Sequence, residues 1–117
     1  MTDRLSSYGY SFQIKVITAL LTDRMFIQQI SDILLPKYFE SDANNWIVTT
    51  ILEYNKEYKS NPTLEVMKVK IEEVEHDVLK QQIIDHLKDA WKYHEASDLD
   101  FIKQQALDFC KNQEIKK

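Results

Sequence analysis

Few residues in this 117-residue chain have the types and spacing that chemistry requires. Glu73 and His76 form one Glu-x-x-His pattern, which places two metal ligands on one helical face in di-iron bundle proteins. Such bundles need a second copy of the pattern and two further glutamates from other helices, and this sequence has no second copy. The pair is therefore interpreted as a solvated helix end, and a ferritin-like enzyme is not supported.

The histidines and the cysteine give no better candidate for catalysis. His76, His86 and His94 are separated by ten and eight residues, too far apart along one straight helix to share a metal ion, so they are interpreted as surface residues. Cys110 is the only cysteine, which excludes an internal disulfide and a cysteine-based zinc site. Its place beside Phe109 predicts a buried, inert thiol.

Nucleotide-binding loops are excluded by the glycine content. Gly9 is the only glycine, whereas the phosphate loop of P-loop ATPases and the dinucleotide-binding fingerprint each need at least two. The chain is therefore predicted to be no enzyme and to bind no cofactor or metal by itself.

Composition predicts one all-α domain that binds proteins. One glycine and two prolines are too few turn residues for a strand-rich fold. The net charge of −4 is divided evenly between the two halves, so no basic face for DNA phosphates is indicated. The sequence has no signal peptide and no apolar run near about eighteen residues, which predicts a protein in solution without a membrane segment.

Apolar spacing predicts a compact orthogonal bundle of about six helices. They are expected near residues 11–22, 24–35, 41–61, 63–75, 77–91 and 97–117. If the break at residues 75–77 does not form, the fourth and fifth helices are one long helix. The residues predicted to form the core are Phe12, Val16, Leu20, Phe26, Ile30, Phe39, Trp46, Ile47, Ile51, Tyr54, Leu87 and Trp91.

The stretch 38–63 is predicted to contain the central core helix. Ser41 or Asp42 can cap its first turn, and Asn61-Pro62 should end it. One face is formed by apolar residues that step by four, three and four positions, namely Ile47, Ile51, Tyr54 and Tyr58. Thr63 is the expected cap of the next helix, whose apolar stripe is broadened by two further valines, Val66 and Val69.

Three regions are expected along the chain. Residues 1–9 form a flexible lead-in, residues 10–96 the helical core domain, and residues 97–117 a C-terminal helix. Nothing stops this last helix before Lys117, which predicts either a fragment of a longer protein or a frayed end. Its apolar residues could pack on the fifth helix or pair with a second copy, and the candidate self-association face is Leu99, Ile102, Phe109 and Ile115.

The order of these features resembles the N-terminal domain of replicative hexameric DNA helicases of the DnaB type, in particular the bacteriophage versions. Residues 12–21, FQIKVITALL, are similar to the opening helix of that family, and residues 38–39 to the aromatic pair before its third helix. Residues 46–54 match its central helix, and residues 62–63 the step that opens the next one. The closing residues 98–117 are similar to the segment that leads into the helical hairpin by which these domains pair.

The resemblance implies a scaffolding and oligomerisation domain that forms a collar on the hexamer and helps to recruit primase or a helicase loader. Expected partners are a second copy of the chain, in a dimer or higher ring through the C-terminal helix, and a primase or loader in the cytoplasm of a bacterial host. Single-stranded DNA would be contacted only indirectly. ATP and magnesium would belong to an absent RecA-like ATPase domain. The alternative is a stand-alone helical adaptor that binds a host or phage protein.

Overall fold

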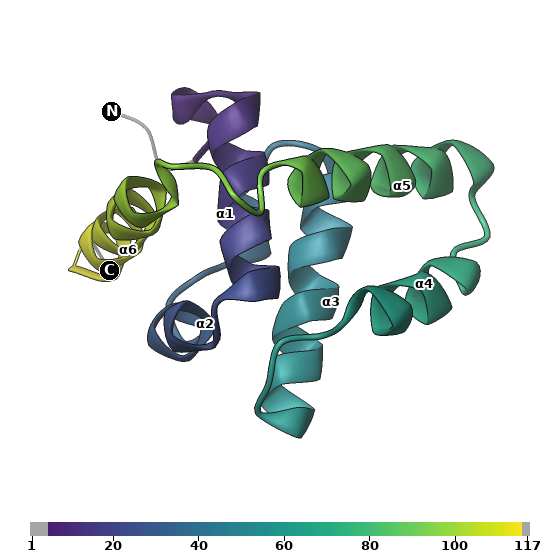
Figure 1. The fold of residues 1–117 in the computed structure, drawn as a ribbon, viewed down its shortest axis with the longest axis horizontal. Helices are drawn as coiled ribbons and strands as arrows, with labels where there is room; N and C mark the ends of the chain where they lie inside the picture. The colour runs from purple at the N-terminus through teal and green to yellow at the C-terminus, as the bar shows by residue number, and fades with distance from the viewer. Residues whose placement is uncertain (1–4, 116–117) are drawn as a thin grey trace.

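The computed structural model describes residues 5–115, which form six α-helices and no strand, as predicted. Two short 3-10 helices, η1 (Leu5–Tyr8) and η2 (Pro36–Tyr38), precede α1 and α3. The α-helices are α1 (Tyr10–Thr22), α2 (Arg24–Ile30), α3 (Asp42–Tyr58), α4 (Leu64–Glu72), α5 (Asp77–Lys92) and α6 (Leu99–Ile115). Figure 1 shows α5 lying across one end of α3 and nearly perpendicular to both α1 and α3, so the bundle is built from helices in different directions.

The centre of the bundle is α1 rather than the predicted helix in residues 38–63. It packs on α2, α3, α5 and α6, whereas α6 packs on α1 and α2. Ile14, Val16 and Ile17 are completely buried although they lie on different sides of α1. A helix that is apolar on all sides is most stable when other helices surround it.

Side-chain caps define where several helices begin. The side chains of Asp23, Ser41 and Thr63 each accept a hydrogen bond from the backbone N–H three residues on, at 3.1, 3.0 and 3.2 Å. At its other end, α3 stops before Pro62 is reached. Lys59 adopts the left-handed conformation, with φ of 59°, which closes the helix three residues earlier than the sequence predicts.

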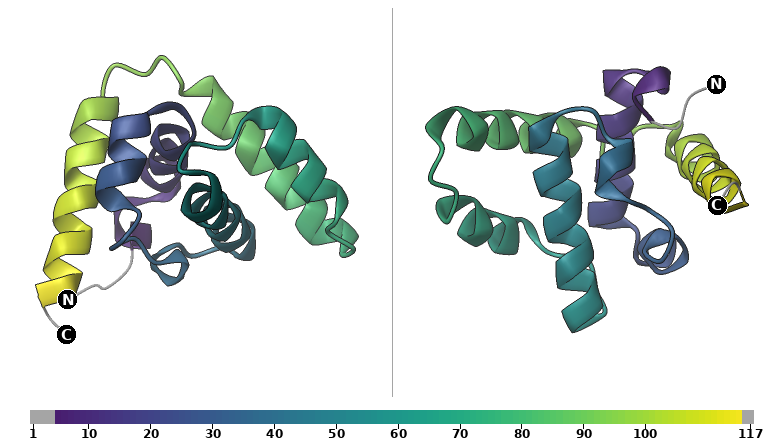
Figure 2. Two further views of the ribbon diagram at one scale, coloured as in Figure 1. Left: turned by 90° about the horizontal axis from the view of Figure 1, so that it is seen from below. Right: turned by 180° about the vertical axis from the view of Figure 1, so that it is seen from behind.

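The predicted break at residues 75–77 separates α4 from α5. The sequence pattern predicts Asp77 as the cap of the fifth helix, but the cap of α5 is His76, whose Nδ1 atom accepts a hydrogen bond from the backbone N–H of Leu79 at 3.2 Å. Helices α4 and α5 form a hairpin of residues 64–92, which we call the α4–α5 hairpin. Figure 2 shows this hairpin extending to one side of the bundle, away from α2 and α6.

Most residues predicted for the core lie in it, with one clear exception. Trp46 and Tyr54 are half-buried, and Trp91 is 48% exposed. The prediction for Trp91 was wrong because Ala90, one position earlier, is the residue of α5 that faces α1. The Thr18 hydroxyl donates a hydrogen bond to the Ala90 carbonyl at 2.7 Å. The buried residues of the predicted set are Phe12, Val16, Leu20, Phe26, Ile30, Phe39, Ile47, Ile51 and Leu87.

The predicted lead-in is structured from Leu5 onward. Leu5 is completely buried and η1 packs on α1, so part of the segment expected as a flexible lead-in forms a 3-10 helix in contact with the core. The first four residues of that segment lie outside the described range. The apolar side chain of Leu5 explains the difference, because burying it fixes the turn around it.

The last helix, α6, is an integral part of the core. Ile102 and Phe109 are buried, Leu99 is half-buried and Ile115 is 81% exposed, so the four residues do not form one free face. The ring of Phe109 packs edge-on against Tyr38, with centroids 5.2 Å apart. The predicted self-association face is therefore wrong as an exposed surface, since half of it is buried within a single chain.

Two ion pairs also join α6 and its preceding loop to the bundle. Nζ of Lys103 lies 2.6 Å from Oδ2 of Asp23, whose other oxygen caps α2. Nζ of Lys15 lies 2.8 Å from Oδ2 of Asp98. The ammonium of Lys103 lowers the pKa of Asp23. Residues 97–115 thus belong to the same folding unit as residues 10–96.

Candidate protein-binding grooves

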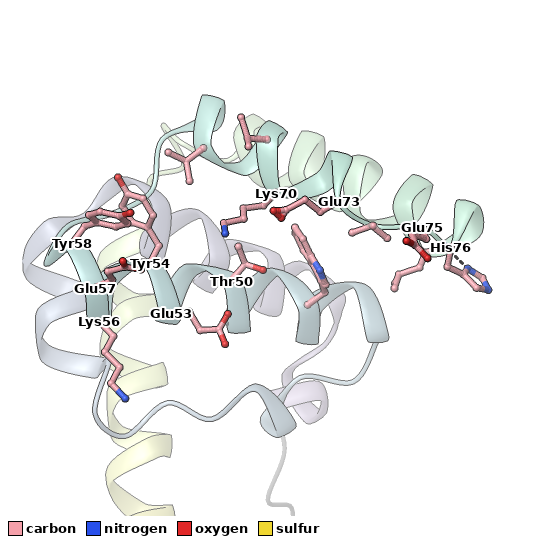
Figure 3. A pocket seen from close by; sticks show the side chains of 15 residues that line it. Thr50, Glu53, Tyr54, Lys56, Glu57, Tyr58, Lys70, Glu73, Glu75 and His76 are labelled. Carbon is pink, nitrogen blue, oxygen red and sulfur yellow. Dashed lines mark hydrogen bonds between the residues drawn. The ribbon is translucent and has the colours of Figure 1, made fainter.

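A broad groove of about 1320 Å³, which we call the α3–α4 groove, separates one face of α3 from one face of α4. Figure 3 shows its two walls, with Tyr54 and Tyr58 on α3 and, opposite them, Lys70 on α4 and Glu73 directly after its end. Thr50 lies on the same wall as the tyrosines. The groove continues past the end of α4 to the loop before α5.

The groove exists because α4 is held by α5 and not by α3. Met67 and Ile71 of α4 are buried and lie on the side of the helix that borders α5. Val66 and Val69 lie on the other side, which lines the groove. Asn61 holds the loop before α4, because its Nδ2 atom donates hydrogen bonds to backbone carbonyls at the end of α1 and beyond.

Aromatic and aliphatic side chains provide the apolar surface of the groove. The rings of Tyr54 and Tyr58 pack together with centroids 4.6 Å apart, and Tyr58 is 59% exposed. Trp46 extends this wall and is half-buried. Val69 on the opposite wall is 65% exposed. Tryptophan and tyrosine contribute much of the binding energy in protein interfaces, so this wall is suited to a protein partner.

The charged side chains around the groove are predominantly acidic. The four carboxylates belong to Glu53, Glu57, Glu73 and Glu75, and the two ammonium groups to Lys56 and Lys70. All six side chains are exposed. Within residues 5–115, none of these four carboxylates forms an ion pair. The lining therefore carries two more negative than positive charges, available to a partner.

A second, smaller depression of about 280 Å³ lies on the other side of α4, and we call it the α4–α5 slot. Its charged residues are both basic, Lys68 and Lys88. Its apolar lining comes from Leu64, Met67, Ile71, Ile84, Leu87 and Trp91. The exposed ring of Trp91, predicted to be core, thus borders this slot. The α4–α5 hairpin has depressions of opposite charge on its two sides.

The three histidines lie apart and have different structural roles. His76 caps α5, and His94 stacks on Trp91 with ring centroids 4.6 Å apart. His86 lies between helices, with Nδ1 2.8 Å from Oδ1 of Asn44 and its ring edge-on to Tyr10 at 5.2 Å. Burial lowers the pKa of His86, although the carboxylates near it act in the opposite direction. The contacts of His86 with Asn44 and Tyr10 join α5 to α3 and α1.

The remaining residues considered for chemistry are not arranged as a reactive site. Glu73 follows the last residue of α4 and His76 precedes α5, so the Glu-x-x-His pattern spans a helix break. Burial, followed by the charge of Glu114, raises the pKa of the Cys110 thiol to about 12. No three His, Cys, Asp or Glu side chains in the described part of the chain are grouped to hold a metal ion.

The described helices and the comparisons with known proteins give two further findings. None of the helices between residues 5 and 115 is both long and apolar enough to cross a membrane. No protein-family model, curated protein or solved structure matches this chain significantly.

The residues of the α3–α4 groove were not predicted as a site. Tyr54 and Tyr58 continue the stripe of Ile47 and Ile51, so the sequence indicates one buried face. In the structure the stripe runs from the core into the groove, because α4 does not cover the last turns of α3. The signal that was present is the pair of extra valines on the fourth predicted segment, which a helix with one packed face would not need.

Proposed function

We propose that this chain is a non-catalytic interaction domain that binds a protein partner in the α3–α4 groove. The observation that carries the proposal is the groove itself: two helix faces with exposed aromatic and aliphatic residues and no helix between them. Exposed apolar patches rimmed by polar residues mark protein-binding sites. A helical domain without a nucleotide-binding loop is well suited to a scaffolding role.

We propose further that the domain is the N-terminal domain of a replicative hexameric helicase of the DnaB type, in the cytoplasm of a bacterial host. The landmarks of the resemblance support this proposal because they occupy ordered places in the fold. Tyr38 and Phe39 are buried just before α3, and Thr63 caps α4. The partner would then be a primase or a helicase loader, and ATP would bind another domain.

Pairing of two copies, which a collar requires, would use the outer face of α6. Phe101 is 63% exposed and Ile115 is 81% exposed. They lie fourteen residues apart, which places them about 21 Å apart on one side of the helix. This face replaces the one predicted from the sequence, whose middle is buried.

A binding experiment with purified proteins tests the proposal. The chain is mixed with the primase and, separately, the loader from the same genome, and complexes are measured by calorimetry and size-exclusion chromatography. We expect one of them to bind, and expect Tyr58→Asp with Val69→Asp to abolish binding, because both side chains are exposed in the groove. Met25→Asp with Gln29→Asp is the matched control, since it introduces the same two charges at exposed positions of α2, outside the groove.

Two results would overturn parts of the proposal. Binding that persists in the groove variant, with its helical content intact by circular dichroism, would show that the partner uses another surface. Absence of any complex with both replication proteins would contradict the helicase assignment. The alternative is then a stand-alone adaptor, which the structure accommodates because a single chain forms the whole groove.

A further inference from the structure

We propose that the occupant of the α3–α4 groove is a basic amphipathic α-helix of about three turns, contributed by the partner protein. This inference rests on the proposed function, because it takes the groove to be the binding site. It adds the secondary structure, length and charge of the segment that binds. The dimensions of the groove support the secondary structure and the length, and its charged side chains support the charge.

The size of the groove fits a helix. The α4 wall of this groove of about 1320 Å³ consists of nine helical residues, about 13.5 Å at 1.5 Å per residue, and the lining continues to His76, so a helix lying along this wall would contact it over roughly three turns. Sites for small molecules are usually between about 300 and 1,000 Å³ and more enclosed. Binding of an extended peptide as an added strand requires a sheet edge, and residues 5–115 contain no sheet.

The two walls specify an apolar stripe on the occupant. Tyr54 and Tyr58 stand on the α3 wall, one turn apart, and Val66 and Val69 on the α4 wall, also about one turn apart. A helix lying between these walls presents one apolar face to them when its large apolar residues recur every three to four positions. Its opposite face stays in water and can be polar.

The charged side chains of the groove indicate which charges the occupant should carry on either side of its apolar stripe. In Figure 3, Glu53 and Lys56 point away from α4, which leaves Glu57, Glu73 and Glu75 against one ammonium group of the groove, that of Lys70. Lysine or arginine beside the apolar stripe would complement these carboxylates. Exposed ion pairs add little affinity individually, but complementary charge selects among partners and accelerates association.

The α4–α5 slot provides an internal comparison. It lies on the same hairpin and has an apolar floor, but its charged residues are Lys68 and Lys88. A basic helix would meet like charges there. The slot is also too small, at about 280 Å³, for a helix of several turns. The inference therefore distinguishes between two apolar depressions within one molecule.

Three labelled peptides of about twelve residues, roughly three helical turns, test this inference by fluorescence anisotropy. The first has leucines along one helical face and lysines beside them, and the second has glutamate in place of each lysine. The third has the composition of the first, with leucines distributed around the helix. We expect the first to bind the chain at least about tenfold more tightly than either other peptide, and to weaken with added salt.

Charge-reversal variants locate the binding site. Glu57→Lys with Glu73→Lys should weaken the basic peptide at least about tenfold, whereas Lys68→Glu with Lys88→Glu in the slot should not weaken it. Glu57→Gln with Glu73→Gln is a milder pair in case the reversal lowers helical content. The inference is overturned if the acidic or the redistributed peptide binds equally well, or if the folded groove variants bind the basic peptide as tightly as the unmodified chain.

The outcomes separate this inference from the proposed function. If primase or loader binding is lost in Tyr58→Asp with Val69→Asp but is unchanged by Glu57→Lys with Glu73→Lys, the groove is the site and the basic-helix inference fails. If the basic peptide binds in the groove but neither replication protein binds, the inference stands and the helicase assignment fails.

Discussion

Folding changes the pKa of His86, so the protonation of this residue affects the stability of the domain. Its Nδ1 atom lies 2.8 Å from Oδ1 of Asn44 in the first turn of α3. Nearby Asp85 and Asp89 favour the charged imidazole, but burial is the larger effect and lowers the pKa of His86 from its ordinary value of 6.5. The folded chain therefore holds this side chain neutral at a pH where the unfolded chain already binds a proton.

The expected result is a loss of stability on acidification. Because the unfolded state binds more protons at His86, the free energy of unfolding should fall as the pH decreases through about 6.5, and this contribution should level off below the folded pKa. Urea denaturation at about pH 7.5 and about pH 5.5 measures it, with His86→Gln as the control. An equal pH dependence in the unmodified chain and the control would contradict the assignment.

Residue type predicts the caps of α3 and α4, and geometry explains why the cap of α5 was missed. Ser41 and Thr63 were predicted as caps because a hydroxyl beside the first turn readily accepts a backbone N–H. His76 was missed because an imidazole can accept such a bond only when Nδ1 is unprotonated and turned toward the helix. A sequence does not show ring orientation or tautomer.

At the scale of elements, α4 is the helix with the least support. Its packed face consists mainly of Met67 and Ile71 against α5, and its other face lines the α3–α4 groove. By contrast, α1 is enclosed by four helices. Helices with few buried contacts open more readily than the core.

We expect backbone amides of α4 to exchange with deuterium faster than those of α1. Opening of α4 exposes little apolar surface, so it should need less free energy than global unfolding, whereas the middle of α1 can open only when the bundle unfolds. Mass spectrometry of peptides from the exchanged protein measures both helices. Equal protection of α4 and α1 would show that α4 is held as firmly as the core.

Apolar periodicity predicts which segments are helical, but not which neighbour each face meets. The stripe from Ile47 to Tyr58 is continuous in sequence, yet Ile47 is buried by the bundle and Tyr58 borders the groove. Trp91 was assigned to the core for the same reason. The position of α4 relative to α3 depends on the loops around Asn61 and His76, and their geometry cannot be derived from a period.

At the scale of the whole molecule, the bundle is closed by its last helix. Phe109 is buried against Tyr38 and lies edge-on to Tyr8, with ring centroids 6.3 Å apart. The helix thus covers α1, α2 and both short 3-10 helices. A substitution at Phe109 therefore disturbs the fold of the single chain, so it cannot be used to test association alone.

Phe109→Asp should unfold the domain or come close to doing so. Loss of a buried aromatic ring costs about 3–5 kcal/mol, and burying a carboxylate in its place costs more. Phe101→Asp should keep the fold, because Phe101 is 63% exposed. Circular dichroism checks both variants, and light scattering of Phe101→Asp tests whether the outer face of α6 mediates pairing. A folded Phe109→Asp variant would contradict the role of α6 in the core.

The all-α fold and the number of helices could be predicted because composition and apolar spacing are properties of the chain itself. The groove could not be predicted from the sequence. It forms because α3 and α4 do not pack together between Tyr58 and Val69, and these two residues are separated along the chain by a loop. The distribution of charge over the folded surface could not be predicted either. The even division of charge along the sequence does not reveal that Glu57 and Glu73 line the same groove.

The one-sided support of α4 has a consequence for how this protein can change over generations. Substitutions at Val66, Val69, Lys70 and Glu73 alter the groove without reaching the core, since only the opposite face of α4 is packed. Most core mutations are constrained by stability, but these positions are largely free of that constraint. Descendants of this chain could therefore exchange one partner for another while keeping the same bundle.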